Sequence, residues 1–409
     1  MPHGSCKVNA ANTVFMVLSS ILVFLMTPGL AFFYGGLSDK KNVLGIKIQS
    51  FVSLGVTAVL WFLVGYSLCF SGDVYGVIGN LDMMCLRGVT PETLFPSTGI
   101  PLLVFISYQM MFAIITPALI TGAFINRITF KAYLLFLVLW QLVVYYPFAH
   151  MVWGGGVLSK LGALDFAGGL VVHILAGMAA LAAVFFVGKR KNSDTQSHNI
   201  PFIALGTGLL WFGWFGFNAG SALAVNSTMA VAFFNTHLSA ATAAITWLLI
   251  DWKWYGKPKL VGFLTGGVAG LVAITPGAGF VAPGSAAVIG VAASIICFYA
   301  VVVKNNFGWD DALDVWGVHG VGGIWGSIAV GLFAQHTWNP AAPNGVLFGG
   351  TGRFLAIQIG ATMIGIVYAF LATSVILWVI NKVTPVKVAG HLEEKGLDEA
   401  LHGEVAYDG

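Results

Sequence analysis

Charged side chains are scarce in this sequence of 409 residues. Asp, Glu, Lys and Arg together make up 9% of it, whereas hydrophobic residues make up 58%. Because soluble domains carry roughly a quarter charged residues, this chain could not cover its surface in water. The composition therefore excludes an ordinary soluble protein and predicts an all-α integral membrane protein that lies in lipid for most of its length.

Cysteines and catalytic motifs are also few. The four cysteines, Cys6, Cys69, Cys85 and Cys297, form no C-x-x-C pair and no metal-ligand spacing, so we expect neither a metal site nor a cofactor. A disulfide between Cys6 and Cys85 is possible in an oxidising compartment, but free thiols are the default expectation. The sequence has no G-x-S-x-G, no H-E-x-x-H and no paired intramembrane carboxylates, so we do not expect an enzyme. No basic tract suggests a nucleic-acid partner.

Apolar runs of about 20 residues, long enough to span a bilayer, fill most of the chain. They predict eleven transmembrane helices, with no convincing signal peptide before the first. We place the helices at 13–36, 43–70, 100–125, 131–150, 165–188, 201–223, 230–250, 259–280, 286–304, 315–335 and 351–380. The expected organisation is a transmembrane conducting domain at 1–380 and a short cytoplasmic regulatory tail at 381–409. That tail is polar and is expected to dock on the chain itself or on a partner.

Positive charges alternate between the gaps that separate these runs. Fifteen of the 19 Lys and Arg residues lie in one set of alternate gaps and in the tail. The positive-inside rule then predicts a multi-pass protein of the cell (inner) membrane, with the N-terminus outside and the C-terminus in the cytoplasm. This orientation needs an odd number of spans, which agrees with eleven.

Two intramembrane histidines lie at matching places in the chain. His173 lies in the fifth expected span, which Asp165 opens, and His319 lies in the tenth, which Asp314 opens. Two halves of five spans must have opposite orientations, which predicts two five-helix inverted repeats plus one additional helix, with a central site. Glycines recur every three residues over Gly317–Gly326, so another helix can pack closely beside His319.

A lone intramembrane histidine is most simply a buried ring that is hydrogen-bonded to a backbone carbonyl. Two at matching places favour function, because polar rings in hydrocarbon are costly and need partners. No Cys, Asp or Glu lies near enough in sequence to complete a metal site. We therefore expect His173 and His319 to form a proton relay or a polar wire through a narrow pore. Asp165 is either an N-cap or a carboxylate that helps to organise an outer cation site.

Aromatic and small polar residues gather near the expected outer ends of spans three, four and six. Phe112, Trp153 and Phe217 supply ring faces, and Ser221 supplies a hydroxyl group. A single interfacial tryptophan is weak evidence, since tryptophan is a common lipid anchor. Several such groups at one mouth would suit a small cation, because ring faces attract it and a hydroxyl oxygen accepts its hydrogen bond.

These motifs, in this order along the chain, resemble those of the ammonium transporter family, which includes the Mep and Rhesus proteins. The resemblance covers nearly the whole chain and is closer to the bacterial and archaeal ammonium transporters, since the contexts of Trp153 and Ser221 are similar to theirs. The motifs that carry it lie at 28–36, around Trp153, and at 165–173, 214–221, 310–323, 396–398 and 402–407.

The resemblance implies a homotrimer with one pore in each subunit. By it, Trp153, Phe112 and Ser221 would recruit NH4+ on the outer side, and Asp165 would support that region. Phe112 and Phe217 would form a stacked gate beneath the recruitment site.

The same resemblance assigns roles deeper in the membrane and in the cytoplasm. His173 and His319 would be twin pore histidines, and the tail would govern conduction and meet a PII-type signalling protein. The expected function is recruitment and deprotonation of NH4+, conduction of NH3, and separate transfer of the proton. The sequence does not decide between this and conduction of NH3 without return of the proton. A membrane sensor that binds ammonium without moving it, and a channel for another small neutral solute, also remain as alternatives.

Overall fold

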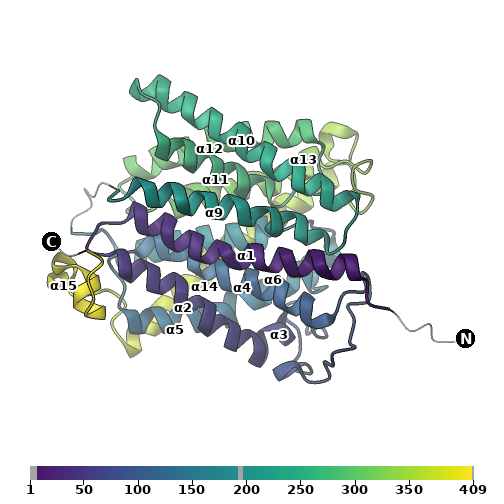
Figure 1. Cartoon of the computed structure of the whole chain (residues 1–409), viewed down its shortest axis with the longest axis horizontal. Coiled ribbons are helices and arrows are strands. Elements are labelled where there is room, and N and C mark those ends of the chain that lie inside the picture. Colours follow the sequence, from purple (N-terminus) through teal and green to yellow (C-terminus); the bar gives the residue numbers. More distant parts are fainter. Residues whose placement is uncertain (1–6, 192–196, 408–409) are drawn as a thin grey trace, which may run out of the picture.

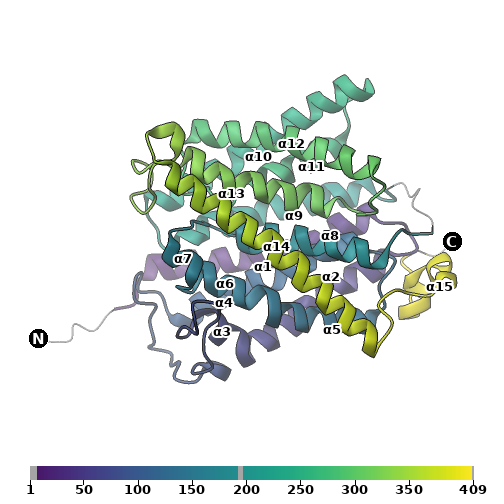
Figure 2. The ribbon, with the colours of Figure 1, turned by 180° about the vertical axis from the view of Figure 1, so that it is seen from behind.

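The computed structural model describes residues 7–191 and 197–407, and every regular element in these ranges is a helix (Figure 1). The expected all-α fold is therefore confirmed. The long helices lie side by side, roughly parallel to one direction (Figure 1). Helix α1 (Ala10–Leu37) begins at one end of this bundle, and α15 (Gly390–Lys395) lies at the other (Figure 2). We call these two ends the Ala10 face and the tail face.

Most helices are long and apolar, and several contain or begin with a short π-helical or 3₁₀ turn. The others of the bundle are α2 (Val43–Leu60), α3 (Tyr66–Phe70), α4 (Leu102–Phe124), α5 (Phe130–Trp140), α6 (Tyr146–Trp153), α7 (Val157–Leu161), α8 (Leu175–Val187), α9 (Ile200–Ala219), α10 (Ser227–Tyr255), α11 (Leu260–Ile274), α12 (Pro283–Asn306), α13 (Val321–Phe333) and α14 (Gly352–Val383). The turns are η1 (Trp61–Gly65), η2 (Met84–Leu86), η3 (Gln141–Tyr145), η4 (Gly169–Ile174), η5 (Gly220–Ala222), η6 (Trp316–Gly320), η7 (Val346–Phe348) and η8 (Asp398–His402).

Ten continuous helical segments of the described chain are long and apolar enough to cross a membrane, so the protein is a multi-pass membrane protein. The eighth expected span differs from the prediction, because α11 has 15 residues and ends at Ile274 rather than near residue 280. At 1.5 Å per residue it rises about 22 Å, less than the ~30 Å of a hydrocarbon core. Pro276 explains this end, since proline has no N–H to donate to the carbonyl of Val272, four residues before it.

The segment 275–282 completes this crossing as buried, non-helical backbone. Its carbonyl groups are hydrogen-bonded by two buried amide side chains. Asn235 Nδ2 donates to the carbonyls of Ala278 and Val281 at 3.0 and 2.8 Å, and Asn339 Nδ2 donates to that of Gly279 at 3.0 Å. Irregular backbone is tolerated at membrane depth only when such partners are supplied.

The two halves of the chain contain corresponding elements, as the inverted-repeat prediction requires. The first helices of the halves, α1 and α9, cross so closely that a Cβ on Gly206 would lie 2.2 Å from the Phe33 nitrogen and 2.6 Å from the Gly29 oxygen. The fifth and tenth spans both begin with a π-helical turn, η4 and η6, and each turn contains one of the two histidines.

The tail docks on the tail face of its own chain. Both Asp398 carboxylate oxygens accept hydrogen bonds from the first turn of α2, from Leu44 N at 3.0 Å and Gly45 N at 2.7 Å. Glu393 accepts a hydrogen bond from Lys191 N at 2.6 Å. The regulatory role of residues 381–409 remains a prediction.

The cysteines add little to the fold. Cys69 and Cys297 are buried free thiols, and Cys85 is exposed. The disulfide considered above would involve Cys6, which lies outside the described residues.

Candidate functional site

His173 and His319 meet at the centre of the bundle. Their Nδ1 atoms lie 3.2 Å apart, within hydrogen-bond distance, and their ring planes differ by 25°. Both side chains are buried. In such a pair one Nδ1 carries the hydrogen and the other accepts it, so the two tautomers are coupled. Within the described chain His173 Nε2 has no hydrogen-bond partner, which leaves one ring nitrogen available.

A glycine crossing brings the two rings together. Gly177, one turn after His173, lies against Gly320, the residue after His319. A Cβ added to Gly177 would lie 2.2 Å from both the Cα and the nitrogen of Gly320, which no side-chain movement could relieve. The close helix approach predicted for the glycine stripe therefore occurs, and it places both histidines at one level.

Asp165 holds the turn that contains His173. Its Oδ1 accepts hydrogen bonds from Gly168 N and Gly169 N at 2.9 and 2.7 Å, and its Oδ2 accepts from Leu170 N and Val171 N at 2.9 and 3.0 Å. Four otherwise unpaired N–H groups at the start of the span are satisfied by one carboxylate. This geometry matches the N-cap interpretation of Asp165.

The sequence interpretation matched Asp165 with Asp314, and this is wrong. Asp311 is the counterpart, because its Oδ2 accepts a hydrogen bond from Trp316 N at 2.7 Å, at the start of η6. Asp314 instead forms an ion pair with Lys304. The spacing carries the signal that was missed, since each capping aspartate precedes its histidine by eight residues.

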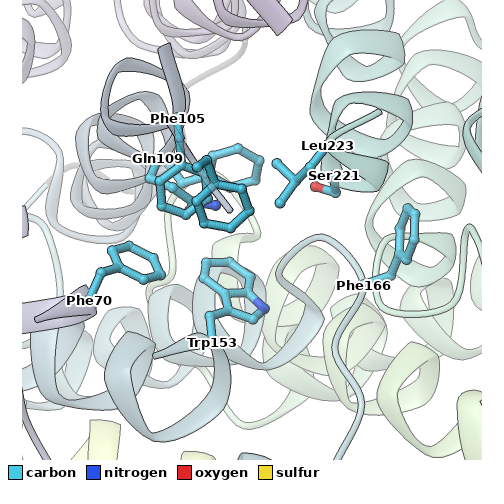
Figure 3. A pocket seen from close by; sticks show the side chains of 9 residues that line it. Phe70, Phe105, Gln109, Trp153, Phe166, Ser221 and Leu223 are labelled. Atoms are coloured by element: carbon cyan, nitrogen blue, oxygen red, sulfur yellow. The ribbon is translucent and has the colours of Figure 1, made fainter. Parts of the chain in front are cut away.

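A cavity of about 210 Å³ opens toward the Ala10 face, and Figure 3 shows the side chains that line it. The centroid of the Phe112 ring lies 5.9 Å from that of Trp153, edge to face, and 4.3 Å from that of Phe217. Trp153 is held by a hydrogen bond from its Nε1 to the Asp165 carbonyl at 2.9 Å. The lining residues are Phe70, Phe95, Phe105, Gln109, Phe112, Trp153, Phe166, Ser221 and Leu223.

Ser221 lies across this cavity from Trp153 (Figure 3). Its hydroxyl donates to the Phe217 carbonyl at 2.9 Å, so its oxygen lone pairs remain as acceptors. The Tyr108 hydroxyl lies 3.2 Å from the Ser221 oxygen and also donates to the Gly216 or Phe217 carbonyl. The structure thus brings together the three residues expected at the mouth. Phe166 and Gln109 were not predicted as site residues. Phe166 directly follows Asp165 in the sequence, and Gln109 lies about one helical turn before Phe112.

The passage below the mouth is narrow and apolar. Phe217 separates the mouth from the histidines, with its ring centroid 6.1 Å from that of His173. The Trp214 ring is stacked with His173 at 5.4 Å and lies 5.5 Å from the Phe217 ring, and its Nε1 donates to Thr275 Oγ1. The void around the two histidines measures only about 10 Å³, near the minimum that holds one water molecule.

A second cavity, of about 390 Å³, opens toward the tail face. Its walls are charged. Arg190 makes a two-pronged contact with Asp310, and Arg127 also approaches that carboxylate. Burial acts to raise the pKa of Asp310, but the two guanidinium groups hold it below its usual value. No group of three or more His, Cys, Asp or Glu that could hold a metal ion occurs in the described part of the chain.

Comparison with known proteins identifies the family. The model of the Ammonium Transporter Family matches residues 14–407. The chain belongs to the ammonium transporter family. An ammonium transporter of Bacillus subtilis is 46% identical over 398 residues, which cover 97% of this chain and 98% of that protein. The archaeal ammonium transporter Amt1 of Archaeoglobus fulgidus is 44% identical over 399 residues, with 97% and 99% covered.

The crystal structure of Candida albicans Mep2 is similar to this transporter as well. It superposes with a TM-score of 0.88 at 36% identity, covering 94% of this chain and 88% of the Mep2 chain. The predicted family is therefore confirmed, and it is a family of transporters rather than enzymes. The roles of the individual site residues stay predictions.

Proposed function

We propose that the transporter recruits NH4+ in the aromatic cavity, on the outer side of the membrane. Trp153 and Phe112 present ring surfaces to a cation, and the Ser221 oxygen can accept a hydrogen bond from it. Asp165 contributes indirectly, since all its hydrogen bonds go to the turn and its carbonyl holds Trp153. Recruitment would remove part of the hydration shell of the ion.

The rings of Phe112 and Phe217, which are in contact but tilted by 37°, act as an apolar gate. They leave no polar group to replace water around an ion, and an unpaired charge in such surroundings costs several kcal/mol or more. Ammonium therefore loses a proton before it passes, and neutral NH3 continues. Potassium resembles ammonium in size and charge but has no proton to lose, so it is rejected.

The single observation that carries this proposal is the 3.2 Å separation of the two Nδ1 atoms in an apolar passage. His173 Nε2 takes the proton that ammonium loses, and His173 gives its own Nδ1 proton to Nδ1 of His319. His319 releases its Nε2 proton on the far side, where it rejoins NH3. One NH4+ disappears on one side and one appears on the other, so one positive charge moves. Each ring then carries its hydrogen on the opposite nitrogen, so both histidines must return to their first tautomers before the next cycle.

The orientation and the assembly also belong to this proposal. We place the transporter in the cell (inner) membrane. The positive-inside rule supports an orientation with the Ala10 face outside and the tail face in the cytoplasm. We also propose a homotrimer with one pore in each subunit, which is what the resemblance of the motifs implies. The docked tail, residues 390–407, is available at the cytoplasmic face for a PII-type signalling protein.

Charge movement tests the mechanism. The purified transporter in a planar bilayer should give a current on addition of ammonium and none with potassium. His173→Leu and His319→Leu should each abolish that current or weaken the discrimination against potassium. His237→Leu is the matched control, because its ring lies exposed on α10, away from the pore. Full current and selectivity in both pore variants would reject the relay.

The same preparation separates the alternatives. A sensor would bind ammonium without any flux into proteoliposomes. A channel for NH3 or another neutral solute would give flux without current. Uptake of ammonium, methylammonium and potassium, measured side by side, distinguishes these cases from the proposed mechanism.

A further inference from the structure

The cavity at the tail face contains three aspartates, and two of them are already neutralised. Asp310 is bound by Arg190 and approached by Arg127, and Asp314 is paired with Lys304. These two carboxylates therefore have permanent cationic partners.

Asp311 lines the same cavity and differs from both. Its side chain is 1% exposed, and its Oδ2 accepts a hydrogen bond from Trp316 N at 2.7 Å. Its Oδ1 has no hydrogen-bond partner among the described residues. Lys304 reaches the backbone carbonyl of Asp311, at 2.8 Å, and directs its other contact to Asp314. One oxygen of a buried carboxylate is thus left without a donor.

The other half of the molecule shows that a π-helical turn of this kind does not require an unpaired carboxylate oxygen. Asp165 occupies the matching place before His173, and both of its oxygens are saturated by four backbone N–H groups. A buried carboxylate oxygen without a donor costs free energy, and a donor that arrives from outside the chain would remove that cost. Burial raises the pKa of Asp311 to about 6, with Lys304 opposing, so the anion at neutral pH is short of positive charge.

We infer that the Asp311 carboxylate, in the cavity at the tail face, is a second ammonium-binding site, where the cation is held after its passage. This inference rests on the proposed function, since it supplies the place where NH3 is protonated again. Ammonium suits the site because it carries both the charge and the N–H donors that Oδ1 lacks. Asp311 also caps the turn that contains His319, so the site lies at the end of the span that carries the second relay histidine.

Thallium(I) tests this site, because it is a heavy monovalent cation of similar size to ammonium. Crystals of the transporter soaked in a chloride-free thallium salt should show anomalous density within about 3 Å of Asp311 Oδ1. The density should vanish in Asp311→Asn, which keeps an oxygen for Trp316 N. It should persist in Asp39→Asn, which changes a carboxylate on the same face outside this cavity. Absence of density in the wild type, or an ordered water molecule only, would overturn the inference.

Transport from the tail face supplies the second measurement. In an oriented bilayer with ammonium added at the tail face, Asp311→Asn should raise the KM roughly tenfold, as expected for loss of a hydrogen bond to a charged group. The KM measured from the Ala10 face should not change. An unchanged KM at the tail face would contradict the site. Absence of any ammonium current in the wild type would instead reject the proposed function, whatever the crystals show.

Discussion

The two histidine turns are built alike, but the ends of the passage to which they lead differ in chemistry. Toward the Ala10 face the passage opens between aromatic rings and one serine. Toward the tail face it opens among lysines, arginines and aspartates, most of them paired. Both carboxylate oxygens of Asp165 accept hydrogen bonds from the turn that contains His173, whereas Oδ1 of Asp311 has no hydrogen-bond partner among the described residues.

This difference teaches that a repeated scaffold can give a pore with a direction. In the proposed mechanism the cation enters where ring faces replace water without fixing the ion in place. It is collected, in the same proposal, where fixed charges face the aqueous side. The two repeated halves each contribute one histidine, whereas the side chains at the Ala10 face and at the tail face differ.

Removing the caps is the strongest way to break this comparison. Asp165→Ala leaves four buried N–H groups without an acceptor, at about 1–3 kcal/mol each, so we expect a loss of at least about 4 kcal/mol of stability. Asp311→Ala leaves Trp316 N without its acceptor and removes the carboxylate that faces Val315 N, so it should cost about 1–3 kcal/mol. Thermal unfolding of the solubilised variants measures the difference. Equal shifts in Tm would show that the two caps are equivalent after all.

The glycine crossing gives the next largest effect. Gly177→Ala would place a Cβ 2.2 Å from backbone atoms of Gly320, so we expect about 3 kcal/mol of destabilisation and loss of ammonium current, since the histidines would separate. Gly320→Ala is milder, because its Cβ would meet Gly177 Cα at 3.3 Å and Trp316 at 3.2 Å.

Gly55→Ala on α2 is the matched control for both, since its Cβ would meet nothing within 4 Å. Its current should equal that of the wild type and its Tm should not fall, because alanine favours a helix more than glycine does. If Gly177→Ala conducted normally, the close approach of α8 and η6 would not be what holds the histidines together.

Contacts of the tail, which occur only at the tail face, should give a smaller effect. Asp398→Ala removes the acceptor for Leu44 N and Gly45 N at the positive end of the α2 dipole, so docking should weaken by about 1–2 kcal/mol. Hydrogen exchange should rise over residues 390–407, while the KM at the Ala10 face stays unchanged. Glu399→Ala is the control, because its pair with Lys395 is exposed. Slow exchange in the Asp398 variant would mean that other contacts hold the tail.

The sequence predicts the pair of histidines better than it predicts the residues that hold them in place. Two Asp-to-His segments in apolar runs suffice to place His173 and His319 together. The wrong match, Asp314, arose because three aspartates lie close together and only tertiary contacts decide which one caps the turn. The early end of α11 had a local signal in Pro276, but hydropathy continued past it because the loop is as buried as a helix.

The π-helical form of both histidine turns could not be predicted. Such turns have no sequence signature of their own, and here tertiary contacts accompany them: a carboxylate at the start and a glycine crossing beside each ring. Hydropathy reports only how much of a segment is apolar, and both turns are apolar in either helical form.

The smallest predicted effect belongs to Ser221, at the aromatic end. Ser221→Ala removes the hydroxyl oxygen proposed to accept a hydrogen bond from ammonium, at a cost of about 1 kcal/mol, which is roughly a fivefold rise in KM. The maximal current should stay the same, because the gate and the histidines are untouched. Ser107→Ala on α4 is the matched control, since that exposed hydroxyl donates only to the Leu103 carbonyl and lies outside the cavity. An equal change in both variants, or a fall in maximal current without a change in KM, would remove Ser221 from the recruitment step and leave the aromatic rings alone at this end.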